Sequence, residues 1–347
     1  MNYSNVFIDA IGYELAPVVI TSTELEARLR PVYDKLRIAP GQLEALTGIV
    51  ERRWWEPDYP LSSGAIAAGR KVLERAGIGG AEVGCLIYAG VCREAFEPAT
   101  ACRVAAGLGI GGAAAVFDLS NACLGVLNGM LEVANRIELG QIRAGLVVSC
   151  ESAREIVDIS IKSLLAAGTM DNFASSLATL TGGSGAVAVL LTDGSFSRGK
   201  QHRLLGAVTQ AAPEHFGLCR WGVMPDKAGA LTQYMTTDAV AVMKHGVELG
   251  ARTWQAFLAE MGWSGADVDR VICHQVGSGH QASILSTLGI LPEKDFTTYE
   301  YLGNIGTVSL PLTAALAAER ELLLPGDRVG FLGIGSGLNC LMMGIAW

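Results

Sequence analysis

The sequence predicts an α/β protein built from two similar halves, and two observations lead to this prediction. The segment 77–87 (GIGGAEVGCLI) returns 185 residues later as segment 262–272 (GWSGADVDRVI), and the apolar run after Arg143 has its counterpart after Arg328 at the same offset. Stretches with helical periodicity also alternate with short apolar runs that are typical of buried strands. A repeat at one spacing indicates a duplicated unit, and the alternation predicts largely parallel sheets covered by helices on both faces.

In the first half, the elements follow in the order helix, strand, helix, strand. Helical periodicity covers residues 63–76, and a glycine turn then leads into an apolar strand at 83–89. A second helical stretch covers 124–139 and a second strand covers 144–149. This order is the one expected of parallel strands joined by crossover helices.

The second half repeats this order. It has helical stretches at 246–261 and 310–323, and apolar strands at 268–274 and 328–334. Each strand follows a glycine-containing turn or a short polar loop, as in the first half. The repeat therefore predicts that corresponding loops of the two halves lie at corresponding ends of their sheets.

We place the first half at residues 1–190 and the second half at 191–347. Residues 21–55 and 154–180 fall outside the repeat and are interpreted as irregular or helical excursions. No Gly/Pro/Ser-rich linker separates the halves, so we expect them to pack together. In such sheets ligands collect outside the carboxyl ends of strands, and reactive residues are therefore sought in the loops there.

Composition excludes several classes of function. The chain has 347 residues, 50% of them apolar and 17% charged, with a formal charge of −8, so it can bury a substantial core and is not disordered. It has no block of Lys and Arg, which argues against nucleic acid and anionic membrane surfaces as partners. Apolar stretches such as 107–117 are shorter than the roughly 18 residues of a spanning helix. The first residues lack a basic region and a cleavable apolar core, and we expect a cytoplasmic protein with no membrane span.

The cysteines and histidines do not form a metal-binding pattern. Eight Cys are scattered without a Cys-x-x-Cys pair, and the five His show no ligand spacing with them. A disulfide framework and a zinc site are therefore not expected. In a reducing compartment most of these thiols are expected to be small buried hydrophobic groups.

Cys123 is the exception that the sequence points to. It lies in segment 117–130 (FDLSNACLGVLNGM), where a strand-like run ends and helical periodicity begins. This places the thiol at a helix N-terminus, where partial positive charge is expected to lower its pKa from about 8.5. A cysteine that packs like alanine in a crowded turn would fit the same local pattern.

Two residues of the second half complete a reactive set. His274 ends the first strand of that half, and Asn304 lies at the loop-to-helix position that corresponds to the Cys123 region. Alone, each is also explained as a core histidine or as a turn or helix-cap residue. Duplication, however, predicts that the three loops meet around one pseudo-twofold axis. In such a set the Cys can form a thioester, and the His and Asn can stabilise an adjacent oxyanion.

Two glycine clusters receive different interpretations. Segment 333–337 (GIGSG) follows the last predicted strand, and the backbone N–H of Gly337 could stabilise an oxyanion, although a tight turn also explains the glycines. Segment 181–186 (TGGSGA) lacks the Lys-Ser/Thr ending of a phosphate loop and the helix that should follow it. We predict instead a strand where backbones approach closely.

Four ordered motifs resemble the ketoacyl synthase III branch of the thiolase superfamily. They are NACLG around Cys123, CHQV around His274, GNIGTVSLP around Asn304, and GIGSG ending at Gly337. The resemblance spans nearly the whole chain, from segment 47–53 (TGIVERR) to the last strand. It implies a thiolase-like fold with five layers in the order αβαβα.

Within this branch the chain looks most like the OleA family, acyl-CoA condensing enzymes that begin bacterial long-chain olefin synthesis. The matching features are segments 92–100 (CREAFEPAT) and 335–340 (GSGLNC) and a final Trp. Glu97 matches the glutamate that in this family crosses the dimer interface into the partner's acyl channel. From the residues alone, it could equally be a solvated carboxylate at a helix start.

The chain also departs from ordinary fatty-acid initiation synthases. Those enzymes usually have an Asn-Thr-Ser/Ala run in the asparagine loop and an Asp in the Gly-rich strand. This chain has Ile305-Gly306 and Gly183 at those places. The resemblance therefore does not favour a housekeeping role with a malonyl carrier.

The resemblance to the OleA family implies the following reaction. Cys123 takes a fatty acyl group from CoA, and Glu97 removes an α-proton from a second fatty acyl-CoA. His274 and Asn304 hold the enolate oxygen, and the N–H groups of Cys123 and Gly337 hold the acyl-enzyme oxygen. The product is a 2-alkyl-3-ketoacyl species, and no metal or redox cofactor is implied.

The same resemblance implies partners and a CoA site. Segments 92–98 and 116–119 resemble dimer-forming segments of the family, so we expect a homodimer, with olefin-pathway enzymes as further partners. Arg52, Arg53 and Trp54 are candidates for holding the CoA nucleotide, because family members bind it near this motif.

Two alternative reactions stay open at this point. A decarboxylative β-ketoacyl-carrier-protein synthase III would use a malonyl donor and need no base, because loss of CO₂ generates the carbanion. A thiolase-fold acyltransferase would instead move the acyl group from Cys123 to an alcohol or amine.

Overall fold

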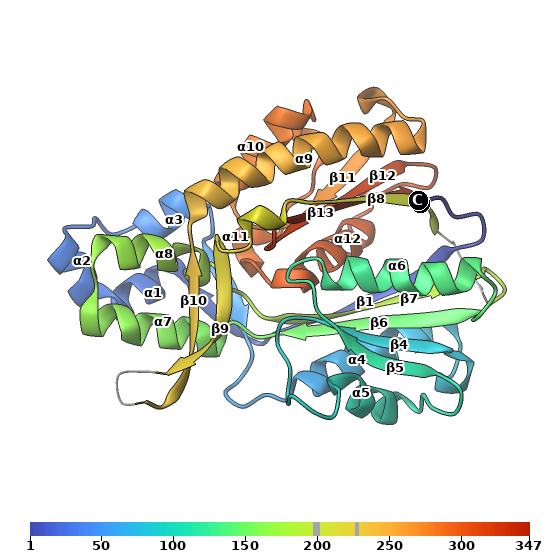
Figure 1. Cartoon of the computed structure of the whole chain (residues 1–347), viewed down its shortest axis with the longest axis horizontal. Coiled ribbons are helices and arrows are strands. Elements are labelled where there is room, and N and C mark those ends of the chain that lie inside the picture. Colours follow the sequence, from blue (N-terminus) through green and yellow to red (C-terminus); the bar gives the residue numbers. More distant parts are fainter. Residues whose placement is uncertain (197–201, 226–228) are drawn as a thin grey trace.

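The chain folds into alternating layers of helices and sheet (Figure 1). The computed structural model describes residues 1–196, 202–225 and 229–347. Within these residues the main sheet has nine strands, which are β1 (Phe7–Leu15), β4 (Cys85–Ala89), β5 (Ala115–Leu119), β6 (Ala144–Glu151), β7 (Gly185–Thr192), β8 (His202–Ala211), β11 (Arg270–Cys273), β12 (Arg328–Gly335) and β13 (Asn339–Ala346). Their order is β11-β12-β13-β8-β1-β7-β6-β4-β5.

This order has the same pattern on either side of one join. Strands β1-β7-β6-β4 on one side correspond to β8-β13-β12-β11 on the other. The two sets meet where β1 pairs with β8 through only two residue pairs, Phe7 with Arg203 and Ile8 with His202. The strand order is thus the one expected of a duplicated α/β unit.

Parallel pairing is confined to the outer strands of the sheet. Strand β4 pairs in parallel with β5 and β6, and β11 pairs in parallel with β12. The inner strands β7, β1, β8 and β13 pair antiparallel with their neighbours. The link from β12 to β13 is too short for a crossover connection, so these strands must run antiparallel.

The helices form three layers around the strands, which gives the predicted five-layer αβαβα architecture (Figure 1). Helices α4 (Leu61–Ala76) and α5 (Thr100–Leu108) cover one outer face, and α9 (Ala239–Met261) and α10 (Ser278–Leu288) cover the other. Between them lie α6 (Gly125–Glu138) and α12 (Ser309–Glu319). Helix α9 begins seven residues before the predicted start at 246, because the Asp238 side chain accepts the Ala241 N–H and caps it there.

A separate group of helices covers one end of the sheet. The excursions predicted at 21–55 and 154–180 are mainly helical and pack around Leu29, Tyr33 and Phe173. They contain α1 (Ser22–Arg28), α2 (Arg30–Leu36), α3 (Gln42–Thr47), α7 (Arg154–Ala167) and α8 (Met170–Leu180), with the small sheet of β2 (Val18–Thr21) and β3 (Glu51–Trp54) beside them. A hairpin of β9 (Cys219–Pro225) and β10 (Leu231–Thr237) packs against α7 and α8.

Short helical turns complete the described chain. They are η1 (Gly80–Glu82), η2 (Pro213–His215), η3 (Gly265–Asp267), η4 (Pro292–Lys294), α11 (Tyr299–Leu302) and η5 (Gly306–Val308). Turns η1 and η3 occupy the repeated segments from which the duplication was predicted. No helix in the described part of the chain has the length and apolar character that crossing a membrane requires.

Candidate active site

A cavity of about 490 Å³ lies between the strand ends and the helices that cover them. Cys123, His274 and Asn304 all line it, as the sequence predicts, and they come from both halves of the chain. The loops that carry them are joined directly, because the Val126 N–H at the start of α6 donates to the Thr307 Oγ1 beside the Asn304 loop, at 2.7 Å. The Cys/His/Asn set is therefore assembled by contact between the two halves.

Cys123 lies at the N-terminal end of α6, after a strained residue. Ala122 has a φ of 44°, in the region that non-glycine residues rarely adopt, and this conformation turns the chain sharply between β5 and α6. Burial raises the pKa of Cys123 to about 12, and the nearby Cys219 and Glu151 contribute in the same direction. The predicted lowering of this pKa by the helix is therefore wrong, since desolvation by burial outweighs the backbone hydrogen bond that would lower it.

His274 directly follows β11 and is almost completely buried, with 6% of its surface exposed. Its backbone N–H donates to the Leu332 carbonyl on β12, which fixes the position of the residue at the strand end. Burial and the neighbouring His280 lower the pKa of His274 to about 3, so the imidazole is neutral near pH 7. Within the described residues its Nδ1 has no hydrogen-bond partner.

Asn304 is held by its own backbone and by one side-chain bond. Its N–H donates to Thr181 and its carbonyl accepts from Gly183, at 3.0 and 2.9 Å. Its side-chain Oδ1 accepts the Gly306 N–H at 3.0 Å, which orients the amide so that Nδ2 remains as a donor for a ligand in the cavity. Gly183 itself permits this approach, since a Cβ there would lie 2.0 Å from the Leu302 carbonyl oxygen.

Gly337 lies in the turn between β12 and β13, next to two residues that line the cavity, Ser336 and Leu338. Its φ of 139° is outside the range that side-chain-bearing residues favour, and a Cβ would lie 2.4 Å from Asn339 Nδ2. Asn339 in turn donates to Asn121 beside Cys123, at 3.2 Å. The glycine turn therefore packs against the nucleophile loop.

The cavity also contains polar residues that were not predicted from the sequence. Glu151, at the end of β6, is 5% exposed, and burial raises its pKa. His280, in the first turn of α10, is 9% exposed, and burial lowers its pKa to about 4. Two further thiols, Cys92 and Cys219, line the same cavity. Glu151 could have been predicted as a site residue, because it is a carboxylate just after the predicted strand 144–149. Nothing in the sequence linked Cys219 to this site.

Glu97 is not part of this cavity within a single chain. It is an exposed residue in the loop between β4 and α5, and it does not line the cavity that contains Cys123. Glu151 is the one carboxylate among the described residues that line the cavity.

The predicted CoA-binding residues lie elsewhere, on strand β3. Arg52 is fully buried, and its guanidinium donates to Ser22 Oγ at 3.0 Å; Trp54 is 1% exposed and donates to the Gly182 carbonyl. Their assignment to CoA is therefore wrong, because both side chains are used inside the protein. Arg53 points to the opposite face of the strand and donates to the Ala16 carbonyl at 3.4 Å.

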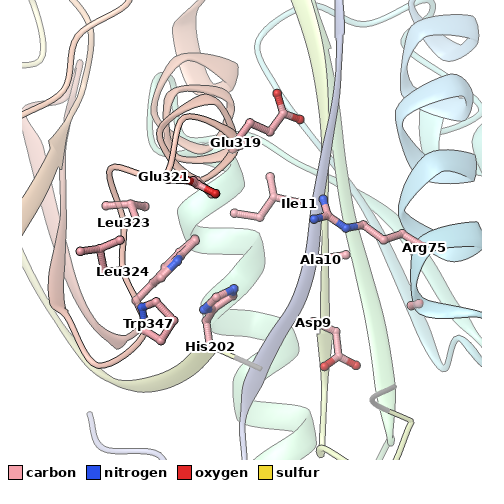
Figure 2. Close-up of a pocket in the computed structure, with 14 residues that line it drawn as sticks. Asp9, Ala10, Ile11, Arg75, His202, Glu319, Glu321, Leu323, Leu324 and Trp347 are labelled. Carbon is pink, nitrogen blue, oxygen red and sulfur yellow. The ribbon is translucent and has the colours of Figure 1, made fainter. Parts of the chain in front are cut away.

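A second cavity, of about 730 Å³, lies near the join between the two halves (Figure 2). Arg75, His202, Glu319 and Trp347 surround it, and the His202 and Trp347 rings stack at 3.8 Å. None of its described lining residues is a cysteine or belongs to the Cys/His/Asn set. In the described part of the chain, no group of three or more His, Cys, Asp or Glu residues has a geometry that could hold a metal ion.

Comparisons with known sequences find relatives that match the whole chain. A sequence model of the C-terminal part of 3-oxoacyl-[acyl-carrier-protein] synthase III matches residues 258–347. The acyl-CoA:acyl-CoA alkyltransferase of Shewanella oneidensis is 59% identical over 349 residues, covering 100% of both chains. The protein of the same name from Xanthomonas campestris is 36% identical over 348 residues, again covering 100% of both.

Solved structures show the same relationship. Cerulenin-bound Xanthomonas campestris OleA is 36% identical, with a TM-score of 0.94, and covers 100% of this chain and 98% of that one. A cysteine-to-serine variant of that OleA, solved with bound lauric acid and lauroyl-CoA, is 35% identical, with a TM-score of 0.92 and coverage of 99% and 100%.

The layered fold and the Cys/His/Asn cavity define an acyltransferase of the thiolase superfamily, related to 3-oxoacyl-carrier-protein synthase III. Within that class, the chain belongs to the acyl-CoA:acyl-CoA alkyltransferase family, OleA.

Proposed function

We propose that this protein condenses two fatty acyl-CoA molecules without loss of CO₂ and forms a 2-alkyl-3-ketoacyl product. The observation that carries the proposal is the 59% identity, over the whole chain, with the acyl-CoA:acyl-CoA alkyltransferase of Shewanella oneidensis. The cavity supplies the groups that such a reaction needs, namely a thiol, a neutral imidazole and an amide donor.

In the first half-reaction, Cys123 Sγ attacks the thioester carbonyl of an acyl-CoA. The C–S bond to CoA breaks, the acyl–Cys123 bond forms, and the thiol proton is delivered to the CoA sulfur. Because the raised pKa of Cys123 keeps the thiol protonated, its proton is transferred to the CoA sulfur as the attack proceeds. The N–H groups of Cys123 and Gly337 stabilise the oxyanion.

In the second half-reaction, a second acyl-CoA loses a proton from its α-carbon. Asn304 Nδ2 and His274 donate to the thioester oxygen, on which negative charge develops as the enolate forms. The enolate carbon then attacks the acyl–Cys123 carbonyl, a C–C bond forms, and Cys123 leaves as the thiolate and recovers a proton. The product of this step is a 2-alkyl-3-ketoacyl-CoA, and hydrolysis of its thioester by water gives the 2-alkyl-3-ketoacid and free CoA.

Glu97 is the proposed base for the second half-reaction, acting in the cavity of a partner copy. An exposed carboxylate outside its own cavity has no role in the chemistry of a single chain, and the loop that carries it lies beside β5, an edge strand of the sheet. Strand β5 is only half-buried, and its free edge is suited to pairing with a second copy. We therefore propose a homodimer in which each copy supplies Glu97 to the other.

Two further expectations belong to this proposal. We expect no metal or redox cofactor, because the reaction is redox-neutral overall: its protons go to sulfur and carboxylate atoms, and hydrolysis of the product thioester consumes one water. A cytoplasmic location also remains a proposal, and cell fractionation would test it.

One experiment distinguishes the reactions. The purified protein is incubated with a single saturated acyl-CoA, and the products are measured by mass together with CO₂ release. A 2-alkyl-3-ketoacid without CO₂ supports the proposal. If a product appears only when malonyl-CoA or a malonyl carrier is added, the decarboxylative reaction is correct. An ester or amide with an added alcohol or amine indicates simple acyl transfer.

The role of Glu97 is tested in the two half-reactions separately. Glu97→Ala is expected to leave CoA release during acylation of Cys123 intact and to slow condensation by about 10²–10⁴-fold, as for loss of a general base. Mixing Glu97→Ala with Cys123→Ala chains should restore activity if Glu97 acts across a dimer, because the mixed dimer has one complete site. Sedimentation that gives a monomer at micromolar concentration would contradict the dimer.

A further inference from the structure

The loop that carries Glu97 is anchored firmly at its beginning. It covers residues 91–99 and joins β4 to α5. At its start, the buried Glu151 carboxylate accepts the N–H groups of Val91 and Cys92, each at 3.0 Å. The tip is different, because Phe96 is fully exposed, at 102%, and Glu97 is exposed beside it. The tip of the loop is therefore exposed, whereas its first residues are held by hydrogen bonds.

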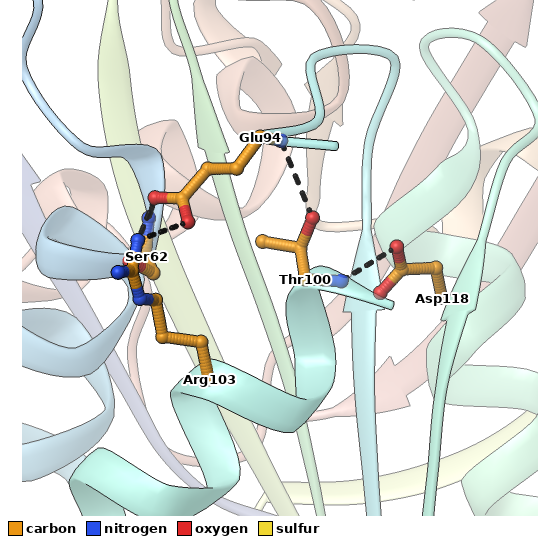
Figure 3. Close-up of polar contacts among 5 residues, drawn as sticks. All are labelled: Ser62, Glu94, Thr100, Arg103 and Asp118. Atoms are coloured by element: carbon orange, nitrogen blue, oxygen red, sulfur yellow. Dashed lines mark hydrogen bonds and ion pairs between the residues drawn. The ribbon is translucent and has the colours of Figure 1, made fainter. Parts of the chain in front are cut away.

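Glu94 anchors the same loop halfway along (Figure 3). Its Oε1 accepts the backbone N–H and the hydroxyl of Ser62, at 2.8 and 2.7 Å, and its Oε2 pairs with Arg103 at 2.9 Å. Its own N–H donates to Thr100 Oγ1 at 3.4 Å. One carboxylate thus connects the loop to α4 and to α5.

The Glu94 carboxylate is held at the start of α4 because this helix lacks an N-terminal cap of its own. Helix α4 begins after Pro60, which offers no side-chain cap, so Glu94 supplies the acceptor that the first turn needs. The Glu94 side chain is only 19% exposed. Burial alone would raise the pKa of Glu94, but hydrogen bonds from Ser62 and Arg103 outweigh it and lower the pKa, so the group is ionised near pH 7.

The far end of the loop is fixed in the same way. Asp118, on β5, accepts the N–H groups of Thr100 and Ala101 at 3.0 and 2.8 Å, in the first turn of α5. Ala99, at the N-cap of α5, has no side chain that could do this. The short tip between Glu94 and Thr100, which contains Glu97, therefore begins and ends at carboxylates bound to helix N-termini (Figure 3).

We propose that Glu94 is a positioning residue for Glu97: it fixes the tip of the loop so that the Glu97 carboxylate is presented to the cavity of a second copy in a single orientation. This inference rests on the proposed function, in which Glu97 is the base. Glu94 itself has its oxygens occupied by Ser62 and Arg103, and it does not line the cavity that contains Cys123. A base displaced by about 1 Å can lose on the order of 10²-fold in rate, so loss of this anchor affects condensation.

The first test replaces Glu94 and a matched residue elsewhere. Glu94→Gln keeps the size of the side chain but removes the charge that pairs with Arg103. We expect condensation to slow by about 10- to 10²-fold while acylation of Cys123 is unchanged. The matched control is Asp267→Asn, since Asp267 also accepts the N–H and hydroxyl of a serine, Ser264, and pairs with an arginine, Arg328. Asp267 does not line the cavity, and its variant is expected to condense at the parent rate.

A double variant separates positioning from a general structural role. Because Glu94 acts only through Glu97, Glu94→Gln in the Glu97→Ala background should cause no further loss. Arg103→Lys, which can keep the ion pair, should retain condensation, and Arg103→Met should lose part of it. The Arg103 pair also tests the proposal if Glu94→Gln does not fold.

Each outcome has a defined meaning. The inference is overturned if Glu94→Gln condenses as fast as the parent, if it slows acylation equally, or if the double variant is slower than Glu97→Ala alone. If Glu97→Ala itself condenses at the parent rate, the proposed role of Glu97 fails first. The two failures are therefore distinguishable in one set of rate measurements.

Discussion

The two halves of the molecule resemble each other in their packing and differ in the loops that form the active site. In both, a long helix leads through a short turn into a parallel strand, as α4, η1 and β4 do in the first half and α9, η3 and β11 in the second. After that strand the first half has the exposed loop 91–99, whereas the second half has His274 and a direct entry into α10. The repeated unit thus provides the framework, and the loops at its strand ends provide different chemistry.

A second difference lies at the sheet edges. Strand β4 has a full neighbour in β5, whereas β11 has only the single bridge from Val271 to Asp295 in the corresponding place. The first half therefore ends in a regular edge strand that can pair with another copy, and the second half does not. The halves differ accordingly in their proposed tasks: the first supplies the nucleophile and the dimer contact, and the second supplies the oxyanion donors.

Removing the nucleophile of the first half should have the largest effect. Cys123→Ala is expected to lower turnover by more than about 10⁴-fold, since every step passes through the acyl–cysteine. Cys219→Ala, which changes another thiol of the same cavity, should retain activity. Peptide mapping by mass after a single turnover with one acyl-CoA gives an independent check, because the acyl group is expected on Cys123. An acyl group on another cysteine would contradict the assignment.

Removing an oxyanion donor of the second half should have a smaller and more selective effect. Asn304→Asp keeps the acceptor for the Gly306 N–H but loses the Nδ2 donor and adds negative charge. Condensation is expected to fall by about 10²–10³-fold, the usual cost of losing such a donor. Single-turnover measurements should show acylation much less affected. Equal losses in both steps would mean that the two halves do not divide the reaction as proposed.

The contact between the halves can be tested through stability. Gly183→Ala would place a Cβ 2.0 Å from the Leu302 carbonyl oxygen, and backbone must move to accommodate it. We expect a loss of about 1–3 kcal/mol in the free energy of unfolding, measured with denaturant. Gly111→Ala is the control, because no atom lies within 4 Å of its added Cβ. A Gly183 variant as stable as this control would show that the close approach is not required.

The last expected effect is a pH dependence of stability that belongs to the second half. The folded chain holds the pKa of His280 at about 4, below its usual value near 6.5, so the unfolded chain takes up this proton first as the pH falls. Stability should therefore decrease between pH 6.5 and about 4, by up to about 1.4 kcal/mol per pH unit. The buried Asp295, whose pKa burial raises to about 6, acts in the opposite direction. His274, whose pKa burial and His280 lower to about 3, contributes in the same direction as His280. Comparing the parent with His280→Gln removes the His280 contribution, and identical pH profiles would contradict the prediction.

Much of this arrangement could be predicted from the sequence because the relevant signals are local and periodic. Cys123 and His274 each follow an apolar run, Asn304 precedes the predicted helix at 310–323, and the repeat relates the loops that carry them. The burial of Arg52 could also have been predicted from the alternation of residues along β3. Arg52 and Trp54 lie on the buried face of this strand and Arg53 lies on the other face, so the pattern does not favour an exposed Arg52.

Other features depend on contacts between distant segments. The raised pKa of Cys123 follows from burial and from Cys219 and Glu151, which approach it only in the folded chain. The antiparallel centre of the sheet depends on where β1 and β8 insert, and the apolar patterns of these strands do not specify this. The anchoring of loop 91–99 by Glu94 joins residues that local periodicity does not relate.

The central place of β1 has a consequence for synthesis of the chain. This strand is among the first segments to leave the ribosome, yet its main partner β7 begins at residue 185 and its other partner β8 follows later. At a synthesis rate of about 5–20 residues per second, β1 is made on the order of ten to thirty seconds before the strands with which it pairs. During that interval a chaperone that shields extended apolar segments would protect the nascent chain from aggregation.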